Sequence, residues 1–175
     1  VMAWMATHYG WQVERKWISL ASGVVPAINM MVQALLQPGD KALIQPPVYY
    51  PFAKAISNNG AVVVENPLLY ENGRYSMDFD DLAVKVADPA VKMAILCSPH
   101  NPVGRVWNKE ELTRFGQICI ENDVIVVADE IHGDLIFDGV DFVSFPTISE
   151  EFADHCIVCN APSKTFNLAG LQTSN

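Results

Sequence analysis

Short apolar runs separated by amphipathic segments constrain the fold of this chain most strongly. The clearest run is Val-Ile-Val-Val-Ala at residues 124–128, in which no polar residue alternates with the apolar ones. A strand with one face in water alternates apolar and polar residues, whereas a strand that helices cover on both faces reads as a continuous apolar run. The run therefore predicts a central strand of a mainly parallel sheet.

The remaining segments predict the same architecture. Strands are expected near residues 42–45, 61–65, 93–98, 124–129 and 156–160, and helices near residues 26–36, 50–58, 78–86 and 109–121. Asn108 is a suitable N-cap for the last helix, and Asn72-Gly73 is a strong signal for a small antiparallel hairpin. We expect an α/β fold, with a mainly parallel sheet covered by helices, in a single domain.

The charge and the apolar runs exclude two classes of partner. The formal net charge is −9 at pH 7, and the few basic residues are scattered. Phosphate backbones are bound by clustered Lys and Arg, so no nucleic-acid partner is expected. The apolar runs are far shorter than the roughly 18 residues of a membrane span, and no signal-peptide pattern opens the chain. We expect a soluble, cytoplasmic protein with no membrane partner.

The four cysteines are Cys97, Cys119, Cys156 and Cys159, and the last two form a C-x-x-C pair. Such a pair can be a redox or zinc motif. The pair lies in an expected strand, however, where positions three apart point to opposite faces, and no second pair exists to complete a zinc site. Buried, reduced thiols are the favoured interpretation, and no metal site is expected.

Three polar residues lie at the ends of three of the expected strands: Asn101 follows one strand, Asp129 ends another, and Lys164 follows a third. Ligands of open α/β sheets bind at the carboxyl ends of the strands. Pyridoxal 5'-phosphate needs an amine for a Schiff base, a carboxylate for its pyridine nitrogen and a donor for its phenolic oxygen. Singly, these residues could be a turn residue, a helix cap and a solvated lysine. Together they favour a pyridoxal phosphate site with Lys164 as the catalytic residue.

A phosphate group needs several fixed donors, and the run Ser-Gly-Val-Val-Pro at residues 22–26 can supply them. A helix N-terminus after a glycine offers backbone N–H groups and a favourable dipole. Gly23 permits close approach of the backbone, and Val24 and Val25 offer amides. Pro26 suits the first helical turn. Ser163, next to the lysine, adds a hydroxyl donor.

Four motifs carry a family resemblance: GVVP at residues 23–26, SPHNPVG at 98–104, DEIHGDL at 129–135 and SKTFNLAGL at 163–171. The chain resembles the fold-type I pyridoxal phosphate enzymes, specifically the class I/II aminotransferase superfamily, and is most similar to its cystathionine beta-lyase branch. The resemblance implies that Tyr49, or else Tyr50, stacks on the cofactor ring. It also implies that His132 contacts the phenolic oxygen; both aromatic positions could instead be packing residues. Many members carry an arginine shortly after the lysine, where this chain has Gln172 and Thr173.

The resemblance also carries expectations about function. It implies that residues 1–175 are a fragment, the cofactor-binding large domain, without an N-terminal arm and without the small domain whose arginine binds the substrate carboxylate. The expected reaction is β-elimination from cystathionine or a related cysteine thioether. The alternatives are transamination of an amino acid and an aminotransferase-like regulatory or binding module. The whole protein is expected to be a homodimer, and the isolated chain to be inactive.

Overall fold

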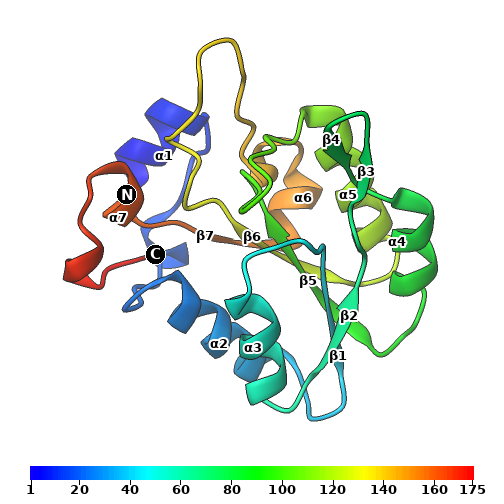
Figure 1. Cartoon of the computed structure of the whole chain (residues 1–175). Helices are drawn as coiled ribbons and strands as arrows, with labels where there is room; N and C mark the ends of the chain where they lie inside the picture. The colour runs from blue at the N-terminus through cyan, green and yellow to red at the C-terminus, as the bar shows by residue number, and fades with distance from the viewer.

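A five-stranded parallel sheet forms the centre of the computed structural model, which describes all of residues 1–175 (Figure 1). The strands lie in the order β2 (Val62–Glu65), β1 (Lys41–Ile44), β5 (Val91–Cys97), β6 (Ile125–Asp129) and β7 (Cys156–Cys159). Every neighbouring pair is parallel. All five expected strands are present close to their expected bounds, so the α/β prediction is confirmed.

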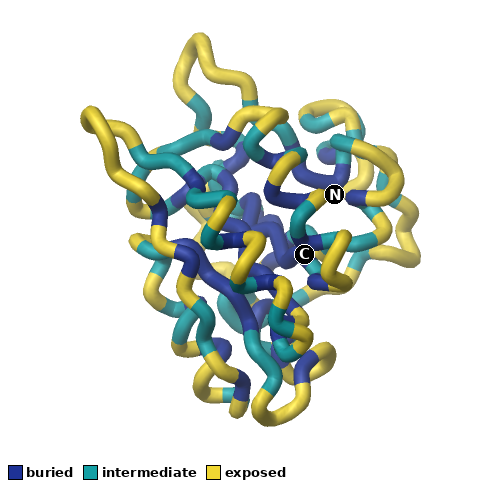
Figure 2. The backbone as a smooth tube through the Cα atoms, turned by 90° about the vertical axis from the view of Figure 1, so that its right-hand side faces the viewer, coloured by how far each residue is buried: buried dark blue, intermediate teal, exposed yellow.

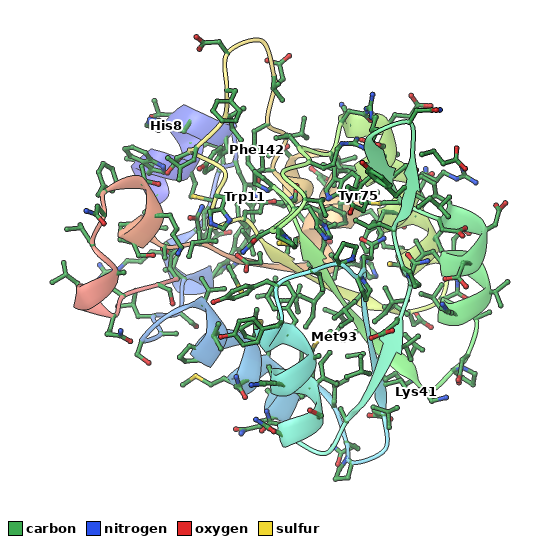
Figure 3. The ribbon with its side chains drawn as sticks, viewed as in Figure 1. His8, Trp11, Lys41, Tyr75, Met93 and Phe142 are labelled. Atoms are coloured by element: carbon green, nitrogen blue, oxygen red, sulfur yellow. The ribbon has the colours of Figure 1, made fainter.

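Helices cover both faces of the sheet, as Figure 1 shows. One face carries α2 (Val24–Leu35) and α3 (Pro51–Asn58); the other carries α4 (Phe79–Val86), α5 (Lys109–Ile120) and α6 (Glu150–Asp154). Each face has its own core cluster, and Met93, labelled in Figure 3, belongs to the α2–α3 side. In Figure 2, buried segments run through the centre of the molecule, which agrees with strands that are apolar on both faces.

Local signals explain several element boundaries. The Asn108 side chain accepts a hydrogen bond from the N–H of Glu111, and the Glu111 carboxylate accepts one from the N–H of Asn108, which completes a capping box at the start of α5. The antiparallel strands β3 (Leu69–Glu71) and β4 (Arg74–Ser76) form the expected hairpin. Asn72 and Gly73 both have positive φ, 51° and 79°, as the tight turn requires.

The sequence did not predict three helices: α1 (Met2–Tyr9), α6, and α7 (Pro162–Thr165). Three short 3-10 turns, η1 (Arg15–Trp17), η2 (Phe145–Thr147) and η3 (Ala169–Leu171), were also not anticipated. The helix α1 has no capping side chain and no acidic residue in its first turn, so the usual start signals are missing. In Figure 1, α1 and α7 lie beside each other, on the side of the molecule where both chain ends are found. None of the helices combines the length and apolarity that a membrane crossing requires.

The cysteines occupy the two sides of the sheet. Cys159 is part of the core cluster under α2 and α3, whereas Cys156 packs against the cluster on the α4–α5 side. The prediction that these two side chains point to opposite faces is therefore confirmed. All four cysteines are free thiols, and burial raises the pKa of Cys156 to about 12, with the charge of Glu130 adding to the shift.

Candidate active site

The carboxyl ends of three adjacent strands are aligned in register. Cys97, the last residue of β5, pairs with Asp129, the last residue of β6, and Asp129 pairs with Cys159, the last residue of β7. Asn101 lies in the turn after β5, and Lys164 lies on α7 after β7. These residues, from distant parts of the sequence, therefore lie on the carboxyl side of the sheet, where α/β folds bind ligands.

Asp129 is a buried carboxylate with unused acceptor capacity. It is 4% exposed, and its Oδ1 accepts a hydrogen bond of 3.2 Å from the N–H of Ile131, while Oδ2 has no partner within the chain. Burial raises its pKa to about 6, although the Ile131 amide and the charge of Lys164 both act in the opposite direction. A positively charged donor placed at Oδ2 would stabilise the anion further.

Lys164 has an exposed side chain that forms no ion pair within the chain. Its charge reaches the neighbouring site residues: it partly offsets the rise in the pKa of Asp129 that burial causes, and it adds to the lowering of the pKa of His132 that is due first to burial. The sequence placed this lysine at a strand end; the structure places it on the four-residue helix α7 that follows β7. A free primary amine at this edge can attack a carbonyl carbon.

A cysteine organises the turn that carries Asn101. The N–H of Asn101 donates to Cys97 Sγ at 3.4 Å, and the same thiol donates to the carbonyl of Pro99 at 3.4 Å. Burial, together with the charge of Asp129, raises the pKa of Cys97, so the thiol stays neutral. The half-buried side-chain amide of Asn101 has no partner within the chain and remains available as a donor.

The N-terminus of α2 fits the expected phosphate cradle in part. Gly23 precedes the helix with φ 141°, a conformation that side chains disfavour, and a Cβ there would meet Pro26 Cδ at 3.4 Å. Its N–H donates to Ser174 Oγ at 3.2 Å, so this amide is already engaged. The amides of Val24 and Val25 lie in the first turn, where no carbonyl within the helix can accept them.

The aromatic candidates differ in their surroundings. Tyr49 packs against the core cluster under α2 and α3, with its ring edge-on to Phe52 at a centroid distance of 5.7 Å. Tyr50 is 69% exposed, and the ammonium of Lys54 lies 5.3 Å from its ring centroid. Of the two, Tyr49 is the one held towards the protein interior. Ser163, the expected additional phosphate donor, has a half-buried side chain that forms no hydrogen bond within the chain.

Sequence reasoning missed three residues that organise the site: Glu130, Asp134 and Ser174. Glu130 is fully buried and accepts hydrogen bonds from Ser144 Oγ at 2.6 Å and from the N–H of Phe145 at 2.7 Å. Asp134 and Ser174 are bonded to residues more than a hundred positions away. Glu130 and Asp134 both lie in the motif at residues 129–135, which gave a signal for their positions but none for their partners, because contacts of such long range leave no pattern in the sequence.

Glu130→Ala is expected to lower the free energy of unfolding by about 2 kcal/mol, because the Ser144 hydroxyl and the Phe145 amide lose their buried acceptor. Glu130→Gln keeps an acceptor and is expected to cost less than ~1 kcal/mol at neutral pH. Burial raises the pKa of Glu130 from 4.5 to about 7. Its ionisation therefore destabilises the folded state as the pH rises through that window, and the Gln variant gains relative to wild type.

Urea unfolding of the three proteins at pH 5 and pH 8 measures both effects. A Glu130→Ala variant as stable as wild type at both pH values would contradict this role for the carboxylate.

Comparisons with known proteins agree with this geometry. The model of the family "Aminotransferase class I and II" matches residues 1–173. Cystathionine beta-lyase PatB of Bacillus subtilis is 48% identical over 174 residues, which are 99% of this chain and 45% of that protein. The asparagine–oxo-acid transaminase of Streptococcus mutans is 31% identical over 162 residues, 93% of this chain and 41% of that protein.

Among solved structures, the crystal structure of cystalysin from Treponema denticola, which contains a pyridoxal 5'-phosphate cofactor, superposes with a TM-score of 0.97. It is 43% identical, and the match covers 99% of this chain and 44% of cystalysin. The chain thus spans less than half the length of these relatives. Because the family model matches the chain almost from end to end, the chain belongs to the class I and II aminotransferase family.

Proposed function

We propose that this chain is the cofactor-binding large domain of a pyridoxal 5'-phosphate enzyme. One observation carries the proposal: β5, β6 and β7 end in register, and Asn101, Asp129 and Lys164 lie at or shortly after these three strand ends. The relatives named above, whose lengths are more than twice the matched region, support the view that further domains belong to the whole protein. We place the substrate-carboxylate arginine outside residues 1–175.

The residues at this edge have the chemistry that the cofactor requires. Lys164 offers the amine for the aldehyde, Asp129 an unpaired carboxylate oxygen for the pyridine nitrogen, and Asn101 an unpaired amide for the phenolic oxygen. The first-turn amides of Val24 and Val25, with Gly23 and the Ser163 hydroxyl beside the lysine, would hold the phosphate. Tyr49 would pack on the cofactor ring, and His132 would lie near the phenolic oxygen. These two residues complete the proposed binding site.

When bound, pyridoxal phosphate acts as an electron sink for an amino-acid substrate. The protein's own part is to hold charges and to move a proton. Lys164, as a free amine, would remove the proton from the substrate α-carbon. Asp129, as an anion, would keep a proton on the nitrogen that it faces. His132 has a lowered pKa, owing first to burial and then to Lys164, so it would act as a neutral imidazole at pH 7.

The favoured reaction is β-elimination from a cysteine thioether such as cystathionine. With cystathionine, the Cβ–S bond breaks, homocysteine leaves, and addition of one water yields pyruvate and ammonia. The 48% identity to a cystathionine beta-lyase supports this choice. Transamination is the second candidate, because a transaminase is 31% identical over nearly the same residues. An aminotransferase-like binding module is the alternative from another class.

An assay of the whole protein separates these functions. We expect pyruvate and ammonia to form from cystathionine without any added 2-oxo acid. A transaminase would instead require a 2-oxo acid as acceptor and would release no ammonia. Absence of both reactions, over a panel of amino acids and with the cofactor supplied, would favour the binding module.

We further propose that the whole protein is a homodimer located in the cytoplasm. Three apolar side chains, Trp17, Leu20 and Met30, are 56%, 78% and 56% exposed, which supports coverage by another part of the protein or by a second subunit. Four free thiols suit a reducing compartment. Light scattering coupled to size-exclusion chromatography tests the dimer: twice the subunit mass supports it, and a monomer at micromolar concentration contradicts it.

A further inference from the structure

One carboxylate outside the proposed cofactor contacts joins α7 to the N-terminal helix. Asp134, in the segment after β6, accepts hydrogen bonds from Trp4 Nε1 at 3.2 Å and from the hydroxyl of Tyr9, both to Oδ1. Its Oδ2 accepts a hydrogen bond of 2.6 Å from the hydroxyl of Thr165. Trp4 and Tyr9 come from α1, whereas Thr165 is the residue that follows Lys164 on α7.

The three donors are neutral, and no ion pair involves Asp134. Hydrogen bonds to an ionised acceptor are stronger than those between neutral groups. Burial, followed by the hydrogen bond to Asp134 and its charge, raises the pKa of Tyr9, so this hydroxyl keeps its proton and stays a donor. With both oxygens engaged, Asp134 is suited to hold protein elements together rather than to bind a cation.

The helix α7 has little support of its own. It consists of four residues and has no capping side chain, and a single helical turn is not stable without tertiary contacts. Its backbone hydrogen bonds are local, from the N–H of Phe166 to Pro162 and from that of Leu168 to Ser163. Among the side chains of residues 162–168, the long-range contacts are the Thr165–Asp134 hydrogen bond and an edge-to-face contact of Phe166 with Trp4, at 5.5 Å between ring centroids.

The surroundings of Asp134 hold it in place. A cavity beside it is lined by His8, Tyr9 and Phe142, and Tyr9 packs edge-on to Phe142 at 5.4 Å. His8 and Phe142 are labelled in Figure 3, where they mark α1 and the segment after β6. The ring of His8 in turn stacks on Trp4 at 3.7 Å. Asp134 is thus held in place by residues of α1, and it bonds to α7 through its other oxygen.

We propose that Asp134 is a positioning residue, which through Thr165 fixes α7 and so sets the place of the Lys164 amine at the sheet edge. The role of Lys164 in this inference rests on the proposed function; the anchoring of α7 does not. The motifs at residues 129–135 and 163–171 did not predict the hydrogen bond between Thr165 and Asp134, because the two residues come together only in the folded chain.

Three variants separate anchoring from general stability. Thr165→Val removes the hydroxyl that bonds to Asp134 and nearly preserves side-chain volume. Thr165→Ser keeps the hydroxyl and serves as the conservative rescue. Tyr9→Phe is the matched control, because it removes one hydrogen bond to Asp134 Oδ1, while Trp4 still donates to that oxygen and Thr165 still donates to Oδ2.

The experiment uses the whole protein and two measurements. Hydrogen exchange followed by mass spectrometry, without cofactor, reports opening of the peptide that spans residues 162–168, with residues 109–120 of α5 as the internal reference. Reaction with pyridoxal phosphate followed by borohydride, with peptide mapping, gives the labelling rate at Lys164. For Thr165→Val we expect amide exchange at residues 162–168 to become about tenfold faster. We expect labelling of Lys164 to become about tenfold slower.

Thr165→Ser is expected to restore both values to within about twofold of wild type, and Tyr9→Phe to change labelling by no more than about twofold. Wild-type rates in Thr165→Val, no rescue by Ser, or equal slowing by Tyr9→Phe would each overturn the proposal. If wild type takes no label at Lys164 while the exchange pattern is as expected, the proposed function is wrong and the anchoring of α7 stands.

Discussion

Lys164→Ala is expected to abolish labelling of the protein by pyridoxal phosphate and borohydride, and to lower kcat of the whole protein by about 10⁴-fold or more. The reason is that one amine would serve both as the attachment point and as the base. Lys164 forms no ion pair and has an exposed side chain, so its removal should leave the free energy of unfolding within about 0.5 kcal/mol of wild type.

Lys92→Ala is the matched control, because Lys92 is an exposed lysine near the start of β5, at the end of the strand opposite the proposed site, and forms no ion pair. We expect this variant to be labelled by pyridoxal phosphate and borohydride to the same extent as wild type, and to have the same kcat. A Lys164→Ala protein that still takes one label per chain would show that the amine at this edge is not the attachment point.

Asp129→Asn is expected to change activity and stability in opposite directions. Asparagine is neutral and cannot hold a proton on a facing nitrogen, so kcat should fall by about 10²–10⁴-fold. Burial raises the pKa of Asp129 from 3.8 to about 6, so its ionisation costs the folded state free energy as the pH rises through this window. The neutral variant, which keeps an acceptor for the Ile131 amide, should then be more stable at pH 7.5 by roughly 1–3 kcal/mol.

Urea unfolding of the cofactor-free protein at pH 3 and pH 7.5 checks the sign. Below the unfolded pKa, both proteins carry a neutral side chain and their stabilities should converge. Greater stability of wild type at pH 7.5 would contradict the proposed environment of this carboxylate. Unchanged kcat would contradict its role.

The parts of the fold that could be predicted from the sequence are those with short-range signals. Continuous apolar runs identified the strands, and the predicted hairpin at Asn72-Gly73 is present because only a few residue types adopt positive φ readily. The alignment of Asn101, Asp129 and Lys164 followed from a general rule, that the carboxyl ends of parallel strands share one edge.

The parts that could not be predicted depend on contacts between distant residues. The helix α7 is too short to show a period of 3.6, and it is held by a hydrogen bond from Thr165 to Asp134. The hydroxyl oxygen of Ser174 accepts a hydrogen bond from the N–H of Gly23, which lies near the other end of the sequence. Glu130 forms its hydrogen bonds on the face of the sheet opposite Asp129, so its neighbour's motif gave no indication of its partners.

Whether Asn101, Asp129 and Lys164 form a pyridoxal phosphate site can be tested directly by one measurement on the wild-type whole protein. The protein is incubated with pyridoxal phosphate, its visible absorption is recorded, and it is then reduced with borohydride and mapped by peptide mass spectrometry. We expect a visible band and a single label, located on Lys164. No band, or label spread over the other lysines, would contradict it and would favour a binding module over an enzyme.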